Sequence, residues 1–456
     1  MSGRVAERRR SSRVRGLRAG SPHHGGLSAV YRRFLPTEFP KLLGKSSVAD
    51  IRLGDSTERD MSILFADIRD FTSLSESLTP RETFLFINGY LKEMEPALLG
   101  ARGVIDKYMG DAIMAIFPTG ADDALRGAVG MLQRLRRFNA GPRRTGGGPV
   151  RVGIGLNAGP TRVGAVGGPH RIQTTVISDA VNLASRLQTL TKTWGLQLLI
   201  SEQAFYSLKD PSVHDIRFVD RVRVRGKERP QSIYEVFDAD PPALRRAKRR
   251  TRPIFEEALA CYHFRDIRCA ARLLRRCLAR CPQDTVARLY LERCRRYQRT
   301  GVHEGTGETL LSIEWTPGCR IGHKAIDRQH RGLFSKVNRF VAAMRRAKTG
   351  AEARELCAFL RRYVKEHFET EERVMREAGY PLRATHQQQH ERFTRDFETL
   401  DRELRERLPE RRVFLLFRIQ LLVVDWIVHH TMKVDRHFGR YLAGRARLRR
   451  RKGGQR

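Results

Sequence analysis

The stretch MSILFADIRDFT, residues 61–72, gives the clearest indication of the fold of this chain. Its unbroken apolar run predicts a buried strand over 61–68 that ends at a carboxylate and a turn. Apolar periodicity predicts a helix over 81–99, and the segment GVIDKYMGDAIMAIF at 103–117 predicts a two-stranded hairpin. Strands mixed with helices in this order predict an α+β or α/β sandwich.

The pattern becomes purely helical downstream, so the 456 residues are expected to form several domains. Residues 254–300 have the alanine and leucine spacing of a short tetratricopeptide-like segment, and the chain from about 312 reads as amphipathic helices sufficient for a four-helix bundle. We expect a basic arm over 1–45, an α+β domain over 46–240, a helical connector over 241–310, an all-α bundle over 311–440 and a basic tail over 441–456.

The overall charge suggests a nucleic-acid or membrane-surface partner, but its distribution does not. Lysine and arginine number 87 against 50 aspartates and glutamates, a formal net charge of +37. The segment 46–240 is nearly neutral, and the excess lies in the arm, the connector and the C-terminal third. Because no nucleic-acid-binding motif accompanies the charge, we expect no specific nucleic-acid partner, and a nucleic-acid binder remains only an alternative.

Cysteine usage and hydropathy indicate a soluble cytoplasmic protein. The seven cysteines include no CxxC pair, and the start of the chain lacks the apolar core of a secretory leader, which predicts reduced thiols. The most apolar stretch, 413–428, is interrupted by Arg418 and Asp425 and is short for a bilayer. We therefore expect no transmembrane segment.

Two aspartates stand where neighbouring predicted strands meet turns. Asp67 ends the strand at 61–68, and Asp111 lies at the tip of the hairpin. Carboxylates that converge at such an edge can bind divalent cations, and two cations are what an in-line displacement at phosphorus requires. Two aspartates alone would more often cap local turns.

The surrounding motifs change that balance. FADIRDFTSLSE, DKYMGDAIMAIF, VGIGLNAGPTRVGAVGG and TTVISDAVNLASRL follow one another in an order and spacing that resembles the class III nucleotidyl cyclase catalytic domain, a ferredoxin-like α+β sandwich. The resemblance covers about 46–238. It implies that Asp67 and Asp111, together with the backbone carbonyl of Ile68, hold two Mg²⁺ or Mn²⁺ ions.

The resemblance also assigns substrate contacts. Lys107 would donate to N1 of adenine, and Thr175 would accept from the exocyclic amine, which favours ATP over GTP because guanine N1 carries a hydrogen. A hydroxyl both donates and accepts, so Thr175 alone leaves a guanylate cyclase as an alternative. Lys227, in a predicted turn, would contact the β- and γ-phosphates.

Asn182 and Arg186 are four residues apart in a predicted helix, so they are expected to lie on one face of it. By the resemblance, Asn182 orients the ribose and Arg186 stabilises the charge that develops on the α-phosphate. The chain departs from the family at Ser178, where glycine is usual, and this puts the rate in doubt if the position needs positive φ. One domain copy carries both halves of the site, which implies a head-to-tail homodimer with two equivalent sites and an inactive monomer.

A second constellation of seven residues lies near the C-terminus. It contains five histidines and two carboxylates, and three pairs among them lie four or five residues apart on predicted helices, which suits a pair of irons. These residues are His330, His367, Glu371, His386, His390, His430 and Asp435. A histidine-rich bundle that binds zinc is the alternative, although one zinc would use only four ligands.

The match is to bacterial hemerythrin over about 312–440. It implies that three histidines, His386, His390 and His430, bind one iron. The other iron would take His330 and His367 and keep an open position for O₂, while Glu371 and Asp435 bridge the pair. No matched role is expected for His323, His429, His437, Glu369 and Glu372.

Both constellations together predict an adenylate cyclase that converts ATP to cyclic AMP and pyrophosphate in a homodimer. Its output would be regulated by a hemerythrin-like di-iron domain that senses O₂, redox state or iron, acting through the helical connector. A different reading is an iron- or oxygen-binding protein with a weak or vestigial cyclase domain, which Ser178 would favour if it were disabling.

Overall fold

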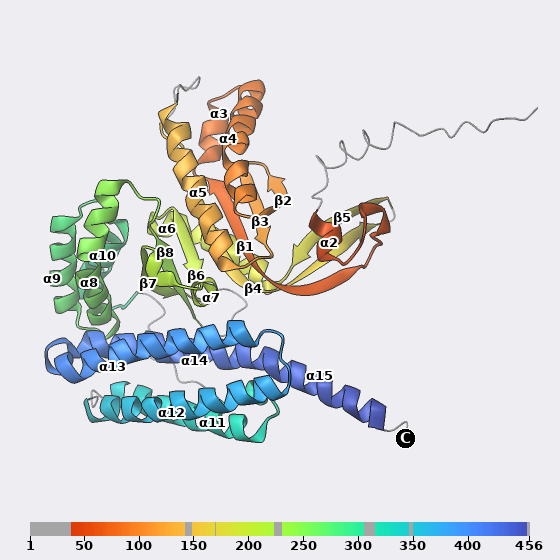
Figure 1. The fold of residues 1–456 in the computed structure, drawn as a ribbon. Coiled ribbons are helices and arrows are strands. Elements are labelled where there is room, and N and C mark those ends of the chain that lie inside the picture. The colour runs from red at the N-terminus through yellow and green to blue at the C-terminus, as the bar shows by residue number, and fades with distance from the viewer. Residues whose placement is uncertain are drawn as a thin grey trace, which may run out of the picture.

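The computed structural model describes residues 38–141, 148–168, 170–222, 230–304, 315–345 and 350–453. Figure 1 shows a sheet domain with its helices, a smaller group of helices beside it, and a helical bundle lying along both. The predicted fold class is confirmed: a mixed α+β domain is followed by helices only.

One mixed sheet organises the first domain. Its strand order is β2-β3-β1-β4-β6-β8-β7, with β5 paired to β4. The strands are β1 (Ser56–Ile68), β2 (Val104–Met109), β3 (Ala112–Phe117), β4 (Val152–Gly168), β5 (Arg171–Ile177), β6 (Leu198–Ser201), β7 (Ile216–Val222) and β8 (Gln231–Val236). β1 lies antiparallel between β3 and β4 at the centre. The predicted strand at 61–68 is therefore the buried half of β1.

Helices cover the sheet and fix its edges. They are α2 (Glu38–Leu42), η1 (Val48–Asp50), α3 (Phe71–Glu76), α4 (Pro80–Gly100), α5 (Ala121–Ala140), α6 (Asp179–Trp194), α7 (Glu202–Ser207) and η2 (Pro211–Val213). α6 packs closely on β4 at Gly155, where a Cβ would lie 2.2 Å from the Gln188 backbone nitrogen. Only glycine allows this approach, which sets the position of α6 over the sheet.

The connector consists of α8 (Pro242–His263), α9 (Ile267–Arg280) and α10 (Thr285–Thr300). It is anchored to the sheet by Arg217 on β7. The buried guanidinium donates to both carboxylate oxygens of Asp284 at 2.6 and 2.8 Å, and to Glu235 at 2.5 Å. The two carboxylates compensate the buried charge of Arg217, so these contacts fix the position of the connector against the sheet.

The C-terminal bundle begins after η3 (Pro317–Cys319). Its helices are α11 (Lys324–Arg345), α12 (Gly350–Glu377), α13 (Arg383–Ile419), α14 (Trp426–His429) and α15 (Asp435–Gly453), with π-helical turns at η4 (Gln420–Asp425) and η5 (His430–Val434). The segment α13 is not one straight helix, because the chain doubles back within it between Glu403 and Arg418, whose side chains pair at 2.5 Å. Phe393 accordingly packs on Trp426, with ring centroids 4.0 Å apart.

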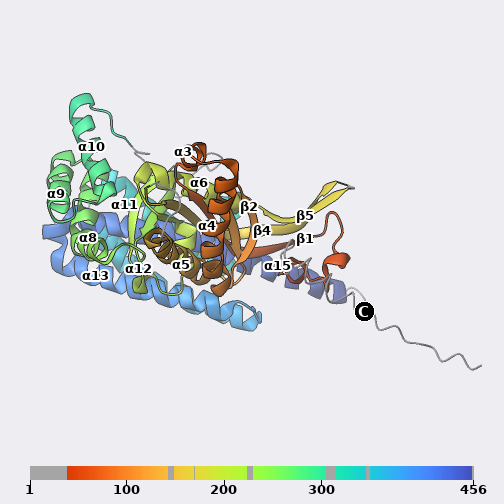
Figure 2. The ribbon, with the colours of Figure 1, turned by 90° about the horizontal axis from the view of Figure 1, so that it is seen from above.

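One helical stretch, Phe414–Arg445, is long and apolar enough to cross a membrane by length and composition. Its most apolar window is 82% buried inside the protein, which is what the core helix of a bundle requires. Figure 2 shows this helix beneath the sheet domain, with the β4–β5 hairpin projecting away from the helical layers.

Candidate active site and metal centre

Asp67 and Asp111 are brought together by strand pairing. β1 and β3 run antiparallel with Ala66 opposite Ile113, so the β2–β3 turn lies beside the end of β1. Gly110 makes this turn with φ 66°, a conformation that glycine adopts without cost. Burial and the adjacent carboxyl of Asp111 raise the pKa of Asp67 to about 6.

The raised pKa of Asp67 indicates whether Asp67 and Asp111 are suited to bind a cation. Two neighbouring carboxylates in a half-buried position repel each other unless positive charge lies between them. The backbone N–H of Ile68 and the side chain of Gln188, at 3.3 Å, donate to Asp67, and they lower its pKa only partly. A divalent cation would supply the missing positive charge, so the donor set fits a hard metal ion. Gln188 was not singled out from the sequence.

Lys107 and Thr175 meet although 68 residues separate them. The Nζ atom of Lys107 on β2 lies 2.8 Å from the hydroxyl of Thr175 on β5. A third residue, Asp106, accepts from Thr175 at 3.1 Å and pairs with Lys107 at 3.0 Å. Asp106 was not among the predicted site residues, because an aspartate beside a lysine is an ordinary surface pattern.

Asn182 and Arg186 lie one turn apart on α6, with Asn182 exposed and Arg186 half-buried. Ser178 precedes this helix in an extended conformation, φ −174°, and its hydroxyl accepts from the Val181 N–H at 3.2 Å. Since the position does not have positive φ, serine adds no backbone strain here and instead caps the helix. Lys227 lies outside the described residues.

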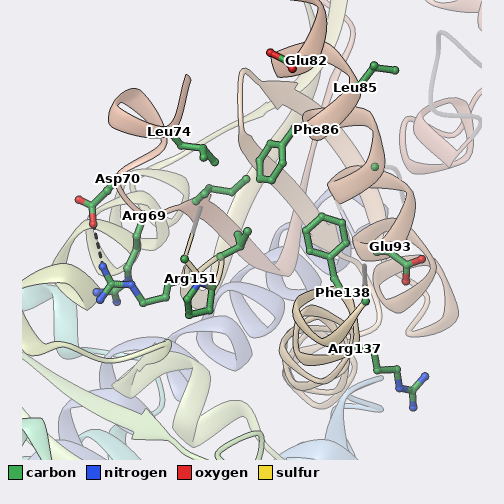
Figure 3. A pocket seen from close by; sticks show the side chains of 16 residues that line it. Arg69, Asp70, Leu74, Glu82, Leu85, Phe86, Glu93, Arg137, Phe138 and Arg151 are labelled. Carbon is green, nitrogen blue, oxygen red and sulfur yellow. Dashed lines mark hydrogen bonds and ion pairs between the residues drawn. The ribbon is translucent and has the colours of Figure 1, made fainter. Parts of the chain in front are cut away.

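A cavity of about 890 Å³ opens beside the end of β1. Figure 3 shows Arg69, Asp70 and Arg151 on one side and Phe86 and Phe138 on the other. Among the predicted site residues that the structure describes, Ile68 alone lines it. We therefore do not assign the nucleotide to this cavity.

The seven residues of the second constellation converge in the core of the bundle. Each is at most 2% exposed, and they come from α11, α12, α13 and the last helix. The Nε2 atoms of His330 and His367 are 3.2 Å apart, and His430 Nε2 lies 3.0 Å from His390 and 3.2 Å from His386. Five ring nitrogens thus point at one another in the core.

The residues separate into two ligand groups. One contains Glu371, His386, His390 and His430, and the other contains His330, His367 and Asp435. Asp435 spans both groups, because its oxygens lie 3.1 Å from His330 and 3.0 Å from His430. Glu371 does the same, with one oxygen 3.6 Å from His367 and 3.4 Å from His390. Three of the histidines thus lie in the first group and two in the second.

Without metal, the charges inside this core are unevenly compensated. Burial lowers the pKa of His367 to about 3 and that of His430 to about 4, so both are neutral, the form that binds metals. Burial also opposes protonation of His386, but Glu371 and Asp435 outweigh it and raise its pKa to about 10. In the described structure, the oxygens of both carboxylates are buried without a well-formed hydrogen bond. Positive metal ions would satisfy them, so the donor set fits a pair of irons.

A π-helical turn places the last two ligands. His430 and Asp435 are five residues apart, which on an α-helix would turn their side chains about 140° away from each other. In η5 the chain instead follows the wider π-helix, in which residues five apart are hydrogen-bonded neighbours. The extra residue in this turn therefore lets both side chains reach the same core.

Two further residues orient the ligands from behind. Nδ1 of His390 lies 2.9 Å from Glu372, and Nδ1 of His367 lies 3.1 Å from Gln329. These contacts leave Nε2 of each imidazole directed to the centre. No role was expected for Glu372, and Gln329 was not among the residues predicted from the sequence. Each of them is adjacent in sequence to a predicted ligand, and this position is the feature from which their role could have been predicted.

Residues 55–236 match the family described as the adenylate and guanylate cyclase catalytic domain, and residues 322–442 match the hemerythrin HHE cation binding domain. The chain joins a cyclase catalytic domain to a hemerythrin domain. The cyclase domain implies use of a divalent metal, and the hemerythrin domain implies iron binding.

Several curated proteins that are similar to the cyclase domain are named adenylate cyclases. The chain is 43% identical over 212 residues to adenylate cyclase of Anabaena cylindrica, which covers 45% of this chain and 42% of that protein. It is 34% identical over 276 residues to a terminal-differentiation-specific adenylate cyclase of Dictyostelium discoideum, covering 59% of this chain and 13% of that one. The solved guanylyl cyclase Cya2 is 31% identical, with TM-score 0.36, over 41% of this chain and 96% of that chain. The chain thus spans less than half the length of these two curated relatives.

Proposed function

We propose that this protein is an adenylate cyclase that converts ATP to cyclic AMP and pyrophosphate. The observation that carries the proposal is the contact of Lys107 with Thr175, since a lysine donor next to a hydroxyl matches the N1 and amino edge of adenine. The adenylate cyclases of Anabaena and Dictyostelium, to which the chain is similar, support the same substrate.

The residues then take the following parts in the reaction. Divalent ions held by Asp67 and Asp111, with the Ile68 carbonyl, would activate the 3′-hydroxyl of ATP and neutralise the phosphates. Asn182 orients the ribose, and the 3′-oxygen bonds to the α-phosphorus while its proton is lost. The bond from the α-phosphorus to the bridging oxygen breaks, and pyrophosphate leaves. Arg186 neutralises the charge that develops on the α-phosphate, and Lys227 holds the departing phosphates.

The active form in this proposal is a head-to-tail homodimer. Three large apolar side chains, Tyr108, Met109 and Ile177, are 43%, 42% and 59% exposed and lie within two residues of Lys107 or Thr175 in sequence. Apolar surface beside a substrate-recognition pair suits burial against a second copy of the chain. Each site would then combine Asp67 and Asp111 of one copy with the adenine-recognising residues Lys107 and Thr175 of the other.

An activity assay on the purified iron-loaded dimer tests this function. With ATP and Mn²⁺ the wild type should release cyclic AMP and pyrophosphate in equal amounts, and should turn over GTP more slowly. Asp67→Ala and Asp111→Ala should abolish turnover and leave the optical spectrum of the iron site unchanged. Absence of cyclic AMP in every iron state would overturn the proposal and leave an iron-binding protein with a vestigial cyclase domain.

We further propose that the hemerythrin domain regulates the cyclase domain in response to O₂, redox state or iron occupancy. The bundle packs directly on the sheet domain (Figure 1). The buried Arg221 on β7 pairs with Asp425 in η4, whose other oxygen accepts from Ser232 on β8 at 2.7 Å. The Tyr206 hydroxyl on α7 donates to the Leu421 carbonyl at 3.1 Å.

This interface is close to the iron ligands in the same helix. Asp425 and His430 are five residues apart, with α14 between them, so they face roughly opposite sides. One side meets the cyclase sheet and the other lines the metal core. The ring of His429, adjacent to the ligand His430, lies 5.3 Å from that of Tyr206. A rearrangement of the ligands would therefore be transmitted through a single short helix, in addition to the predicted route through the connector.

The regulatory proposal is tested with one preparation in three states. Cyclase activity is measured under anaerobic reduced, oxygenated and oxidised conditions, with the optical spectrum recorded for each. The proposal predicts different rates in at least two of these states, and equal rates in all three and in iron-free protein would contradict it.

A further inference from the structure

Asp106 is a buried carboxylate that has no part in the proposed mechanism. Its side chain is fully buried, although it stands next to Lys107, whose side chain is 28% exposed. One of its oxygens, Oδ2, accepts from the Thr175 hydroxyl at 3.1 Å and lies 3.0 Å from Lys107 Nζ. A buried carboxylate is costly unless it is paired and hydrogen-bonded, as Asp106 is through Oδ2.

A β-bulge explains how two consecutive residues reach the same partner. In a regular strand the side chains of neighbours point to opposite faces. The pairing of β2 with β3 shifts between Ile105 and Lys107, so Asp106 is the extra residue of a bulge. Bulges re-aim side chains next to functional sites. Here the bulge brings Asp106 and Lys107 to Thr175 together.

The hydrogen atoms in this cluster can be assigned by the chemistry of the three groups. A hydroxyl has one hydrogen and two acceptor positions, an ammonium group only donates, and an ionised carboxylate only accepts. The Thr175 hydrogen is therefore directed to Asp106, and Lys107 donates to one Thr175 lone pair. The remaining lone pair is available to a ligand. Lys107 likewise uses two of its three hydrogens within the cluster and retains one.

We propose that Asp106 is a specificity-determining positioning residue that fixes the Thr175 hydroxyl as an acceptor and so selects adenine over guanine. This inference rests on the proposed cyclase function. Adenine offers an amino donor at position 6 and an acceptor at N1, which match the free lone pair of Thr175 and the free hydrogen of Lys107. Guanine in the same place offers an acceptor at position 6 and a donor at N1, and both contacts become repulsive.

The substitution Asp106→Leu tests the proposal because it replaces the two carboxylate oxygens with methyl groups, which removes the acceptor and keeps the branching of the side chain. The Thr175 hydrogen is then free to donate to the guanine carbonyl. We expect kcat/KM for ATP to fall and that for GTP to rise, so that the ATP-to-GTP ratio shrinks by about tenfold or more. Asp106→Asn keeps an acceptor oxygen toward Thr175 and should retain most of the preference.

A second pair of variants shows whether Asp106 acts through Thr175. Thr175→Val removes the hydroxyl at nearly constant shape and should shrink the ratio by itself. Adding Asp106→Leu to Thr175→Val should change the ratio no further. A full additional loss in the double variant would overturn the inference, as would an Asp106→Leu protein that loses both activities in equal proportion.

The outcomes separate this inference from the proposed function. A wild type that makes neither cyclic nucleotide, or that prefers GTP, contradicts the function itself. A wild type that prefers ATP, combined with an unchanged preference in Asp106→Leu, contradicts only the role of Asp106. If Asp106→Leu does not yield folded dimer, Thr175→Val still decides, because an unchanged preference in that variant overturns the proposal.

Discussion

The guanidinium of Arg221 on β7 and the carboxylate of Asp425 in the bundle form a buried ion pair between the two domains. Their side chains are 1% and 6% exposed, and Ser232 completes the contact. A buried charge that loses its partner remains desolvated without compensation. The pair therefore restricts how the hemerythrin domain can move relative to the sheet.

Breaking this pair should uncouple the domains. In Asp425→Asn, Arg221 loses its charged partner, and we expect the difference in cyclase rate between reduced and oxidised protein to disappear while both metal sites remain loaded. The thermal midpoint should fall, because removing one member of a buried pair costs about 3–5 kcal/mol. Arg440→Ala is the matched control, since it breaks an exposed interdomain pair with Glu58 at 3.7 Å that contributes at most about 1 kcal/mol. A full redox response in Asp425→Asn would exclude this route.

Arg186 should act on the chemical step. Arg186→Ala should lower kcat for ATP by about 10²- to 10³-fold, as expected when one donor to developing charge is removed, and change KM little. Steady-state kinetics with Mn²⁺ provide the measurement. Lys192→Ala, on the same helix with a 73% exposed side chain, should remain near wild-type activity. If both variants lose activity equally, the effect belongs to α6 as a whole.

Glu372 should support the iron site from behind. Glu372→Ala removes the partner of His390 Nδ1, and we expect iron affinity to fall by about 10- to 100-fold. Competition with a chelator, followed by the optical spectrum, measures the change. Glu369→Ala, an exposed carboxylate on the same helix, is the control and should leave the affinity unchanged. Equal affinities in the two variants would show that Glu372 is not needed to orient His390.

Asp67 should make the stability of the cyclase domain depend on pH. Its folded pKa of about 6 lies above the ordinary value of 3.8, so the folded state binds the proton more tightly than the unfolded state. The contribution of Asp67 to stability is therefore lost as pH rises from about 4 to about 6. In protein free of Mg²⁺ and Mn²⁺, Asp67→Asn should raise the melting temperature more at pH 8 than at pH 5. A pH-independent effect would contradict the repulsion between Asp67 and Asp111.

Much of both candidate sites could be predicted from local sequence because spacing determines which residues share a face. His386 and His390, four apart on a helix, must point to one side, and the order of the cyclase motifs placed Asp67 and Asp111 at one edge. Asp106 could not be predicted, since its orientation depends on a bulge in the pairing of β2 with β3. The pair of Arg221 with Asp425 joins residues 204 apart, and no local pattern indicates such a contact.

The π-helical turn at His430–Val434 sets how the last helix, α15, is rotated about its own axis relative to the helix before it. If this turn became α-helical with the same number of residues, every residue beyond it would be rotated about the helix axis by about 100°. Asp435 would then leave the core, and Arg440 would swing away from Glu58. Metal binding consequently fixes the rotational orientation of the C-terminal helix. Deletion of a single residue between 431 and 434 would leave the two ligands four residues apart, on one face of an ordinary α-helix, and should preserve the di-iron site.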